Sequence, residues 1–399
     1  MIKFFLVFLL FFCIGVTTGC DRREMNDIAI VLGWGMDQKD DGKYVASAQF
    51  AIPSKLANSA GGGGGGGAED GYLLETATGK NPTDAGQNMQ LKLSRTIFAS
   101  HRKLIVLGEE VAKNGITNII DEYSRNPDVR LRTDIFVVKG AKAADFLSIP
   151  YKLEKIPALG PIKIHESVGG TESATFKEFL SDASSDGINP SLPAIEIVNS
   201  GSSGNNSSSG NAKTFKITGR ALFDNNLKMV GYLTPSEAKD RFFIKGELNK
   251  NVFTVNVPEG DGNISFDGSK YKSKIKPVIK GENINFIVSL SAKGMIRENN
   301  TNLDLKSSKN IAFIETALQK QIAKEVSDTI SHVQKDFGID VFGFGQVVHR
   351  KYPKKWRTLK RNWNADFSEA KVTVKADITV EAVGATGPSL QLKESRIKK

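Results

Sequence analysis

The chain has few of the residues on which disulfide frameworks and metal clusters depend. Only two cysteines and four histidines occur in 399 residues. This number excludes a disulfide scaffold, and the sequence offers no paired Cys/His spacing for a zinc cluster. Long apolar runs are equally scarce, because the single example lies at the N-terminus. A polytopic membrane protein is therefore excluded.

Composition and length describe an ordinary globular chain. Lys and Arg number 54 against 44 Asp and Glu, which gives a formal net charge of +10, and hydrophobic residues make up 40 %. The length predicts two or three domains with substantial cores. The basic residues are spread along the sequence, so the charge by itself indicates only an affinity for acidic surfaces.

The N-terminal apolar run predicts a secretory signal peptide. Phe4–Val16 follows a lysine and spans about 20 Å as a helix, less than the roughly 30 Å hydrocarbon core of a bilayer. The next residues, Thr17-Thr18-Gly19-Cys20, are similar to a bacterial lipobox, although Thr17 stands where that motif usually has Leu. We expect residues 1–19 to be removed and Cys20 to carry a diacylglycerol anchor. The alternatives are an uncleaved membrane anchor and an unmodified exported cysteine.

The first part of the mature chain alternates between strand and helix patterns, which predicts an α/β domain. Gly61–Gly67 interrupts it with seven glycines. No strand leads into this run and no Lys-Ser/Thr follows it, so it predicts a flexible loop and not a nucleotide site. Strands are predicted at Ile28–Leu32, Tyr44–Ile52, Leu104–Leu107 and Ile135–Val138, and helices from Asn81-Pro82, from Glu109 to a stop at Pro127, and at Ala141–Leu147.

The remainder of the chain predicts two further domains. Thr234-Pro235-Ser236-Glu237 is a capping box, which predicts a helix that ends at Gly246. An apolar stripe at spacings of three and four predicts one long helix over 310–337. Strands are predicted at 215–223, 227–233, 252–257, 273–279, 283–296 and 371–380. The predicted fold class is α+β, with an N-terminal α/β domain (20–153), a middle domain with a flexible insertion at 199–211 (154–250), a C-terminal α+β domain (251–386) and a polar tail (387–399).

The sequence contains no arrangement of residues typical of an enzyme. It has no G-x-S-x-G turn, and no histidine has a second histidine four residues later or a C-x-x-C nearby. Adjacent carboxylates such as Asp40-Asp41 and Asp121-Glu122 point apart on regular structure, so we interpret them as solvated. We therefore predict no catalytic residues, no cofactor and no bound metal.

One basic segment, 349–361, stands out because it has seven Lys or Arg, no acid and two aromatic residues. This composition suits nucleic acid, an anionic membrane surface or an acidic partner. An exported protein rarely meets nucleic acid, which leaves the other two. The alternative is a solvated basic helix whose Trp356 and Leu359 pack inward. The candidate membrane or partner contacts are Arg350, Lys351, Lys354, Lys355, Trp356 and Arg357.

Four sequence blocks resemble the Ger(x)C family, lipoproteins that form the C subunit of spore germinant receptors. They follow the order of that family along nearly the whole mature chain. The Trp that usually follows the lipidated cysteine is absent here, and the two low-complexity insertions are additions. The blocks are CDRREMNDIAIV (20–31), FASHRKLIVLGEEVA (98–112), RNPDVR (125–130) and GIDVFGFG (338–345) with Trp356 and Trp363.

The resemblance implies a three-domain α+β fold with mixed sheets, lipidation of Cys20, and a place on the outer surface of the spore inner membrane. It implies two integral-membrane partners, the A and B subunits of a nutrient germinant receptor, and it supplies no catalytic residues. The leading hypothesis is therefore a non-enzymatic receptor subunit. A solute-binding lipoprotein of a transporter is the main alternative, although no two similar lobes are evident. A cell-wall enzyme and an unrelated extracytoplasmic adaptor are further alternatives.

Overall fold

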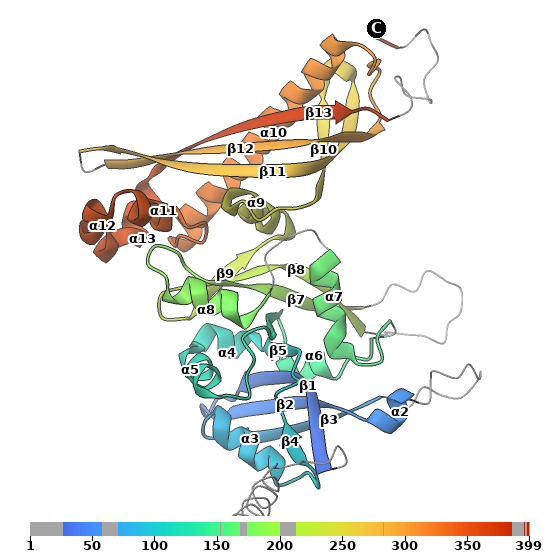
Figure 1. Cartoon of the computed structure of the whole chain (residues 1–399), viewed down its shortest axis with the longest axis vertical. Helices are drawn as coiled ribbons and strands as arrows, with labels where there is room; N and C mark the ends of the chain where they lie inside the picture. The colour runs from blue at the N-terminus through green and yellow to red at the C-terminus, as the bar shows by residue number, and fades with distance from the viewer. Residues whose placement is uncertain are drawn as a thin grey trace, which may run out of the picture.

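The structure is a computed structural model that describes residues 27–57, 71–151, 153–167, 174–199, 213–281, 283–384, 395 and 397–398. The molecule is elongated, with the N-terminal sheet at the lower end of Figure 1 and the C-terminal sheet at the upper end. The expected signal peptide, Cys20, the Gly61–Gly67 run, nearly all of the 199–211 insertion and nearly all of the polar tail lie outside the described residues.

Nine strands form the first sheet, in the order β3-β2-β1-β5-β6-β7-β8-β9, with β4 paired to β1. The pairs β1–β5, β5–β6 and β6–β7 are parallel. Every residue of β5 is fully buried, as expected for a central parallel strand covered on both faces. The strands are β1 (Ile28–Gln38), β2 (Tyr44–Ala51), β3 (Tyr72–Gly79), β4 (Thr96–Phe98), β5 (Leu104–Leu107), β6 (Asp134–Lys139), β7 (Ser191–Asn199), β8 (Lys213–Phe223) and β9 (Met229–Leu233).

The helix predicted from Glu109 is two helices in the structure. It breaks at Gly115, whose φ of 112° is incompatible with a continuous helix. The capping box at Thr234 is confirmed, and Gly246 ends that helix in the left-handed conformation. The helices of this part are α2 (Pro53–Ala57), α3 (Pro82–Gln90), α4 (Glu109–Asn114), α5 (Thr117–Arg125), α6 (Ala143–Leu147), α7 (Gly160–Ser167), α8 (Phe176–Ser184) and α9 (Pro235–Lys245).

The first sheet runs across the predicted boundary between residues 153 and 154. β6 pairs with β7, with Val137 opposite Ala194, and β8 and β9 then extend the same sheet. Residues 154–250 therefore do not form a sheet of their own, because their strands complete the sheet begun by the N-terminal segment. The division into three domains stays a prediction.

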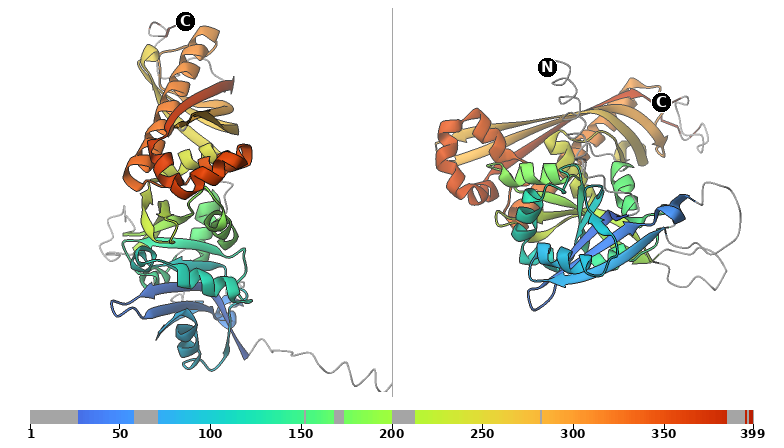
Figure 2. Two further views of the ribbon diagram at one scale, coloured as in Figure 1. Left: turned by 90° about the vertical axis from the view of Figure 1, so that its left-hand side faces the viewer. Right: turned by 60° about the horizontal axis from the view of Figure 1, so that its bottom comes forward.

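Four strands form the second sheet, in the order β10-β11-β12-β13, with the pair β12–β13 parallel. The long helix predicted over 310–337 is α10 (Ser308–His332), followed by one π-helical turn over Val333–Phe337. α10 buries Ile314 to Ile330 of the predicted stripe against one face of this sheet. Figure 1 shows α10 behind the strands, and no helix of the described residues is drawn in front of them. Figure 2 shows the same sheet from two further sides. The remaining elements are β10 (Asn251–Val257), β11 (Gly262–Lys280), β12 (Asn283–Asn299), α11 (Phe344–Lys351), α12 (Pro353–Leu359), α13 (Trp363–Glu369) and β13 (Lys371–Ala382).

A buried polar junction connects the part built on the first sheet to the part built on the second. The amide N of Asn189 donates to the carbonyl O of Asp340 at 2.6 Å. Fully buried Arg241 donates from Nε to the carbonyl O of Val341 at 2.9 Å and lies 3.5 Å from the carboxylate of Asp182. The Asp340 carboxylate accepts four further hydrogen bonds, from the amides of Phe342, Gly343 and Gly345 and from Nε1 of Trp363.

Candidate functional site

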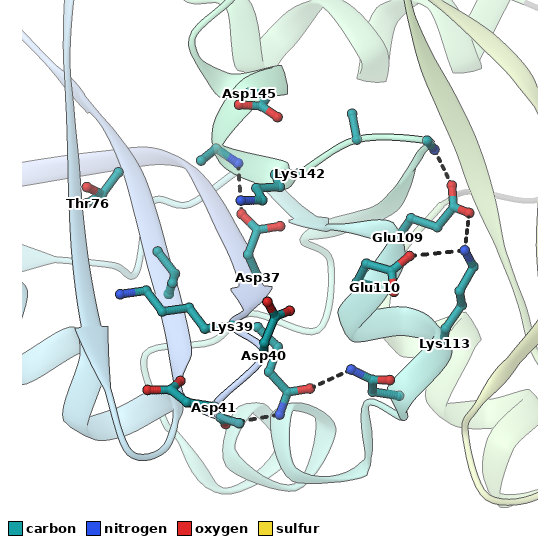
Figure 3. A pocket seen from close by; sticks show the side chains of 17 residues that line it. Asp37, Lys39, Asp40, Asp41, Thr76, Glu109, Glu110, Lys113, Lys142 and Asp145 are labelled. Atoms are coloured by element: carbon teal, nitrogen blue, oxygen red, sulfur yellow. Dashed lines mark hydrogen bonds and ion pairs between the residues drawn. The ribbon is translucent and has the colours of Figure 1, made fainter.

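A polar pocket of about 1280 Å³ opens at the carboxyl ends of the parallel strands β1, β5 and β6 (Figure 3). Ligands of open α/β sheets bind outside this edge, because the loops that follow parallel strands meet there. In this chain those loops are 38–43 after β1, the start of α4 after β5, and 140–145 after β6. The sheet topology therefore brings together side chains that lie more than a hundred residues apart.

Asp37 lies at the base of this pocket, near the end of β1. Its carboxylate accepts hydrogen bonds from the amides of Ala143 at 2.8 Å and Ala144 at 3.0 Å, so it caps the start of α6. Burial raises the pKa of Asp37, and the two amide hydrogen bonds oppose that shift. Gly108 makes room for the carboxylate, because a Cβ at that position would lie 2.0 Å from Oδ1 of Asp37. Asp37 positions α6 and is not available as a free base.

Glu109 at the start of α4 connects two walls of the pocket. Its carboxylate accepts from the amide of Gly140 and pairs with Nζ of Lys113 at 2.7 Å. Burial acts to raise the pKa of Glu109, but the hydrogen bonds from Lys113 and Gly140 outweigh it and the pKa is lowered. Lys113 also pairs with Glu110 at 3.1 Å. One ammonium group thus pairs with two carboxylates, so this wall keeps a net charge of −1.

Four charged side chains around the mouth remain without such partners. Lys39, Asp40, Lys142 and Asp145 make no side-chain hydrogen bond or ion pair with any other residue that the structure describes. Two ammonium and two carboxylate groups are thus free to meet a charged ligand. Within the described ranges no group of three or more His, Cys, Asp or Glu is arranged to hold a metal ion. The arrangement suits ion pairing with a small polar molecule.

No local pattern in the sequence predicts this pocket. The interpretation of Asp40-Asp41 as a solvated pair leaves the pocket out, and Asp41 pairs with Lys43 in the adjacent turn at 2.7 Å. The convergence of 38–43, 109–114 and 140–145 depends on the parallel order of β1, β5 and β6, which periodicity does not specify.

The predicted contact residues of the basic segment lie on α11 and α12, far along the chain from the pocket. Trp356 is 2 % exposed and packs against His349 and Trp363, with ring centroids 5.6 and 5.1 Å away. Trp356 and Leu359 are therefore core residues, as the alternative interpretation held, and Trp356 does not present a surface to a partner. Of the five basic candidates, Lys355 is half-buried. The other four are exposed: Arg350, Lys351, Lys354 and Arg357.

Cys20, the predicted lipidation site, lies outside the described residues. Where the structure does describe the chain, none of its helices combines the length and the apolar character needed to cross a membrane.

Comparison with known proteins shows similarity along nearly the whole chain. The family model described as "Spore germination protein N-terminal domain" matches residues 21–197, and the one described as "Spore germination B3/ GerAC like, C-terminal" matches residues 218–384. Putative spore germination protein YfkR of Bacillus subtilis (strain 168) is 28 % identical over 94 % of this chain and 95 % of that protein. Spore germination protein KC of the same organism is 26 % identical, with 96 % of each chain covered.

A solved structure supports the fold. The crystal structure of the GerBC protein superposes with a TM-score of 0.54, covering 88 % of this chain and 97 % of that chain at 18 % sequence identity. This likeness confirms the predicted α+β, or mixed α/β, fold class with mixed sheets, of which the structure has two.

Proposed function

The chain belongs to the spore germination GerAC family, and from this premise we propose that it is the lipid-anchored, non-enzymatic subunit of a nutrient germinant receptor. The observation that carries the proposal is the match of two successive family domains over residues 21–197 and 218–384, directly after a lipobox-like cysteine at position 20. In this proposal the diacylglycerol on Cys20 holds the protein on the outer surface of the spore inner membrane, beside the integral-membrane A and B subunits.

The position of β1 supports an anchor at one end of the molecule. Cys20 precedes Asp27, the first described residue, by seven positions, and seven extended residues reach at most about 25 Å. β1 starts beside β4, with Ile28 opposite Thr96, at the lower end of Figure 1. An anchor on Cys20 therefore keeps this end of the first sheet close to the bilayer.

The surface next to the start of β1 is compatible with a membrane. Leu91, at the end of α3, is 85 % exposed, and Lys92 and Arg95 follow it in the loop that leads to β4. Lys92 pairs with Glu75 at 3.0 Å, so Arg95 is the basic side chain here without an acidic partner among the described residues. An exposed leucine near a basic side chain suits the interface of an anionic membrane, where such a side chain contributes up to about 1 kcal/mol.

Substitution of Cys20 tests the proposal, since a tether raises the local concentration of partners without adding contacts. We expect Cys20→Ala to yield a folded protein that leaves the spore membrane fraction and does not restore germination in a strain lacking the native protein. Cys13→Ala is the matched control, because that cysteine belongs to the expected signal peptide, and it should germinate normally. Full nutrient germination by Cys20→Ala with the protein off the membrane would contradict the proposal.

The polar pocket favours a second candidate function, a solute-binding lipoprotein. The free charges of Lys142 and Asp145 at the pocket mouth are the observation that supports it. Calorimetry of the isolated chain with small nutrients tests this candidate. Binding of a nutrient that is lost in Lys142→Ala and in Asp145→Ala would favour the solute-binding function. If no nutrient that triggers germination releases heat on mixing with the protein, the receptor-subunit role is the better account.

A further inference from the structure

The face of the second sheet that α10 leaves open carries an unusual charge pattern. In β11 the side chains alternate, so that Lys272, Lys274 and Lys276 are exposed while Tyr271 and Ile275 pack toward the core. Figure 2 shows this face of the strands turned away from α10. Three lysines at a spacing of two residues thus line one strand of an uncovered sheet.

The pairing of the strands adds two more lysines to the same face. Ser289 of β12 lies between Lys274 of β11 and Lys375 of β13. Lys371 lies on the same face of β13, four residues before Lys375 and opposite Asn285 of β12. We call this set the lysine face: Lys272, Lys274, Lys276, Lys371 and Lys375.

No acidic side chain among the described residues lies within ion-pair distance of these lysines. None of the five lysines forms an ion pair with another described side chain. By contrast, Lys270 of β11 and Lys293 of β12 pair with Glu381 at 3.1 and 3.2 Å. One acidic side chain, Asp377 of β13, lies on the same face, two residues after Lys375. Ser291 of β12 lies between it and Lys272 of β11. Like charges on neighbouring strands repel, so an unneutralised set is an attractive surface for an anion.

The lysine face is continuous with the basic segment on α11 and α12. Nζ of Lys351 lies 3.4 Å from the carbonyl O of Ile275, and Nζ of Lys355 lies 3.4 Å from that of Gly281. Both carbonyls belong to the β11 side of the β11–β12 hairpin. The positive charge therefore extends from the open sheet face around the edge of β11.

We propose that the lysine face docks an acidic surface of a partner protein. Ser289, Ser291 and Thr373 lie between or beside the lysines, together with one apolar side chain, Ile287. The small polar side chains permit close approach and supply hydrogen bonds at a flat interface. The second sheet lies at the opposite end of the long axis from the start of β1 (Figure 1). The choice of a protein over a lipid surface rests on the anchor proposed for Cys20, which places that other end at the membrane.

A charge-reversal comparison in the purified full-length chain tests this docking surface. The test variant is K272E/K274E/K375E, and the probe is fluorescent poly-L-glutamate in a titration at low salt. The control is K306E/K320E/K335E, which makes the same change of net charge at exposed lysines that lie on or beside α10 on the other side of the sheet. We expect the test variant to lose about tenfold or more in affinity and the control less than about threefold.

Two further arms make the outcome decisive. K272Q/K274Q/K375Q should show an intermediate loss, which excludes misfolding by repulsion, and thermal unfolding should show that all variants are folded. Vesicles of phosphatidylglycerol and phosphatidylcholine form the lipid arm. Equal losses of poly-L-glutamate affinity in test and control variants overturn the proposal, as does a loss of vesicle binding in the test variant with unchanged poly-L-glutamate binding. Neither poly-L-glutamate binding nor vesicle binding tests the anchor on Cys20. The Cys20→Ala variant tests that anchor, so failure of one proposal can be distinguished from failure of the other.

Discussion

Asn189 and Asp340 bond to each other twice across the junction between the two sheets. The backbone N–H of Asn189 donates to the carbonyl O of Asp340 at 2.6 Å. The backbone N–H of Asp340 donates to Oδ1 of the Asn189 side chain at 3.2 Å. Both residues are almost fully buried. Because one belongs to the N-terminal family domain and the other to the C-terminal one, this reciprocal pair fixes how the halves of the chain meet.

The Asp340 side chain should be essential for that junction. In the native protein each oxygen of the Asp340 carboxylate accepts two hydrogen bonds from N–H groups. Asp340→Asn replaces one of these oxygens by an NH₂ group, which then faces two N–H donors and can accept from neither. We expect a loss of about 2–4 kcal/mol in the free energy of unfolding, measured by chemical denaturation. Asp377→Asn, at an exposed position on β13, is the control and should change stability by less than about 0.5 kcal/mol. Equal effects of the two substitutions would contradict this role.

Gly187 should be required for the close approach of the two halves. Its φ is +80°, and a Cβ there would lie 2.5 Å from the carbonyl carbon of Gly345. Gly42 has nearly the same φ, +81°, with nothing within 4 Å of its Cβ position. Gly42→Ala should therefore cost about 1 kcal/mol for backbone strain alone, whereas Gly187→Ala should cost at least about 2 kcal/mol more. Thermal unfolding measures both, and similar losses would show that the halves do not meet as described.

Local signals in the sequence predicted the elements well where they were strong. The capping box at Thr234 fixed the start of α9, and the stripe from Ile314 to Ile330 fixed α10. The break at Gly115 was missed, since the apolar spacing continues through it and only the positive φ interrupts the helix. The pairing of β6 with β7 was missed as well, because residues far apart in the chain determine it.

Protonation of Asp240 should make the protein more stable at moderately acidic pH. Burial raises the pKa of Asp240 to about 7, although Oγ1 of Thr329 donates to its carboxylate at 2.6 Å. The pKa is near 4 in an unfolded chain. The folded state then binds more protons between about pH 4 and pH 7, so the free energy of unfolding falls as the pH rises through that window.

Asp240→Asn should remove this dependence while keeping an acceptor for Thr329. The slope of unfolding free energy against pH should become less negative by up to about 1.4 kcal/mol per pH unit between pH 5 and pH 7. Urea denaturation at several pH values measures the slope, and Asp377→Asn again serves as the control. An unchanged slope in Asp240→Asn would show that another group titrates in its place.

Substitutions at buried and at exposed residues of the basic segment should affect different properties: the buried ones stability and the exposed ones association. Trp356→Ala removes a core ring and should cost about 3–5 kcal/mol of stability. K354E/K355E/R357E changes two exposed side chains and the half-buried Lys355, so it should cost far less stability. It should weaken association with the partner subunits, which co-purification from spore membranes measures. Unchanged association in the charge-reversal variant would remove the segment as a contact surface.

The candidate sites show why sequence alone was not sufficient. Trp356 was a candidate contact because basic and aromatic residues alternate, yet the packing of α11–α13 buries it. The lysine face was equally visible as a two-residue repeat in β11, but its meaning depends on Lys371 and Lys375, which the parallel pairing of β12 with β13 brings to the same face. The pocket depends in the same way on the order of β1, β5 and β6.

The lipid on Cys20 is the central claim, because the proposed orientation, location and tethering of the protein all depend on it. Mass spectrometry of the N-terminal peptide from protein extracted from spore membranes tests it most directly. The account predicts a peptide that begins at Cys20 and carries the mass of a diacylglycerol group on sulfur. A peptide with a free thiol at Cys20, or one that still contains residues 1–19, would contradict it.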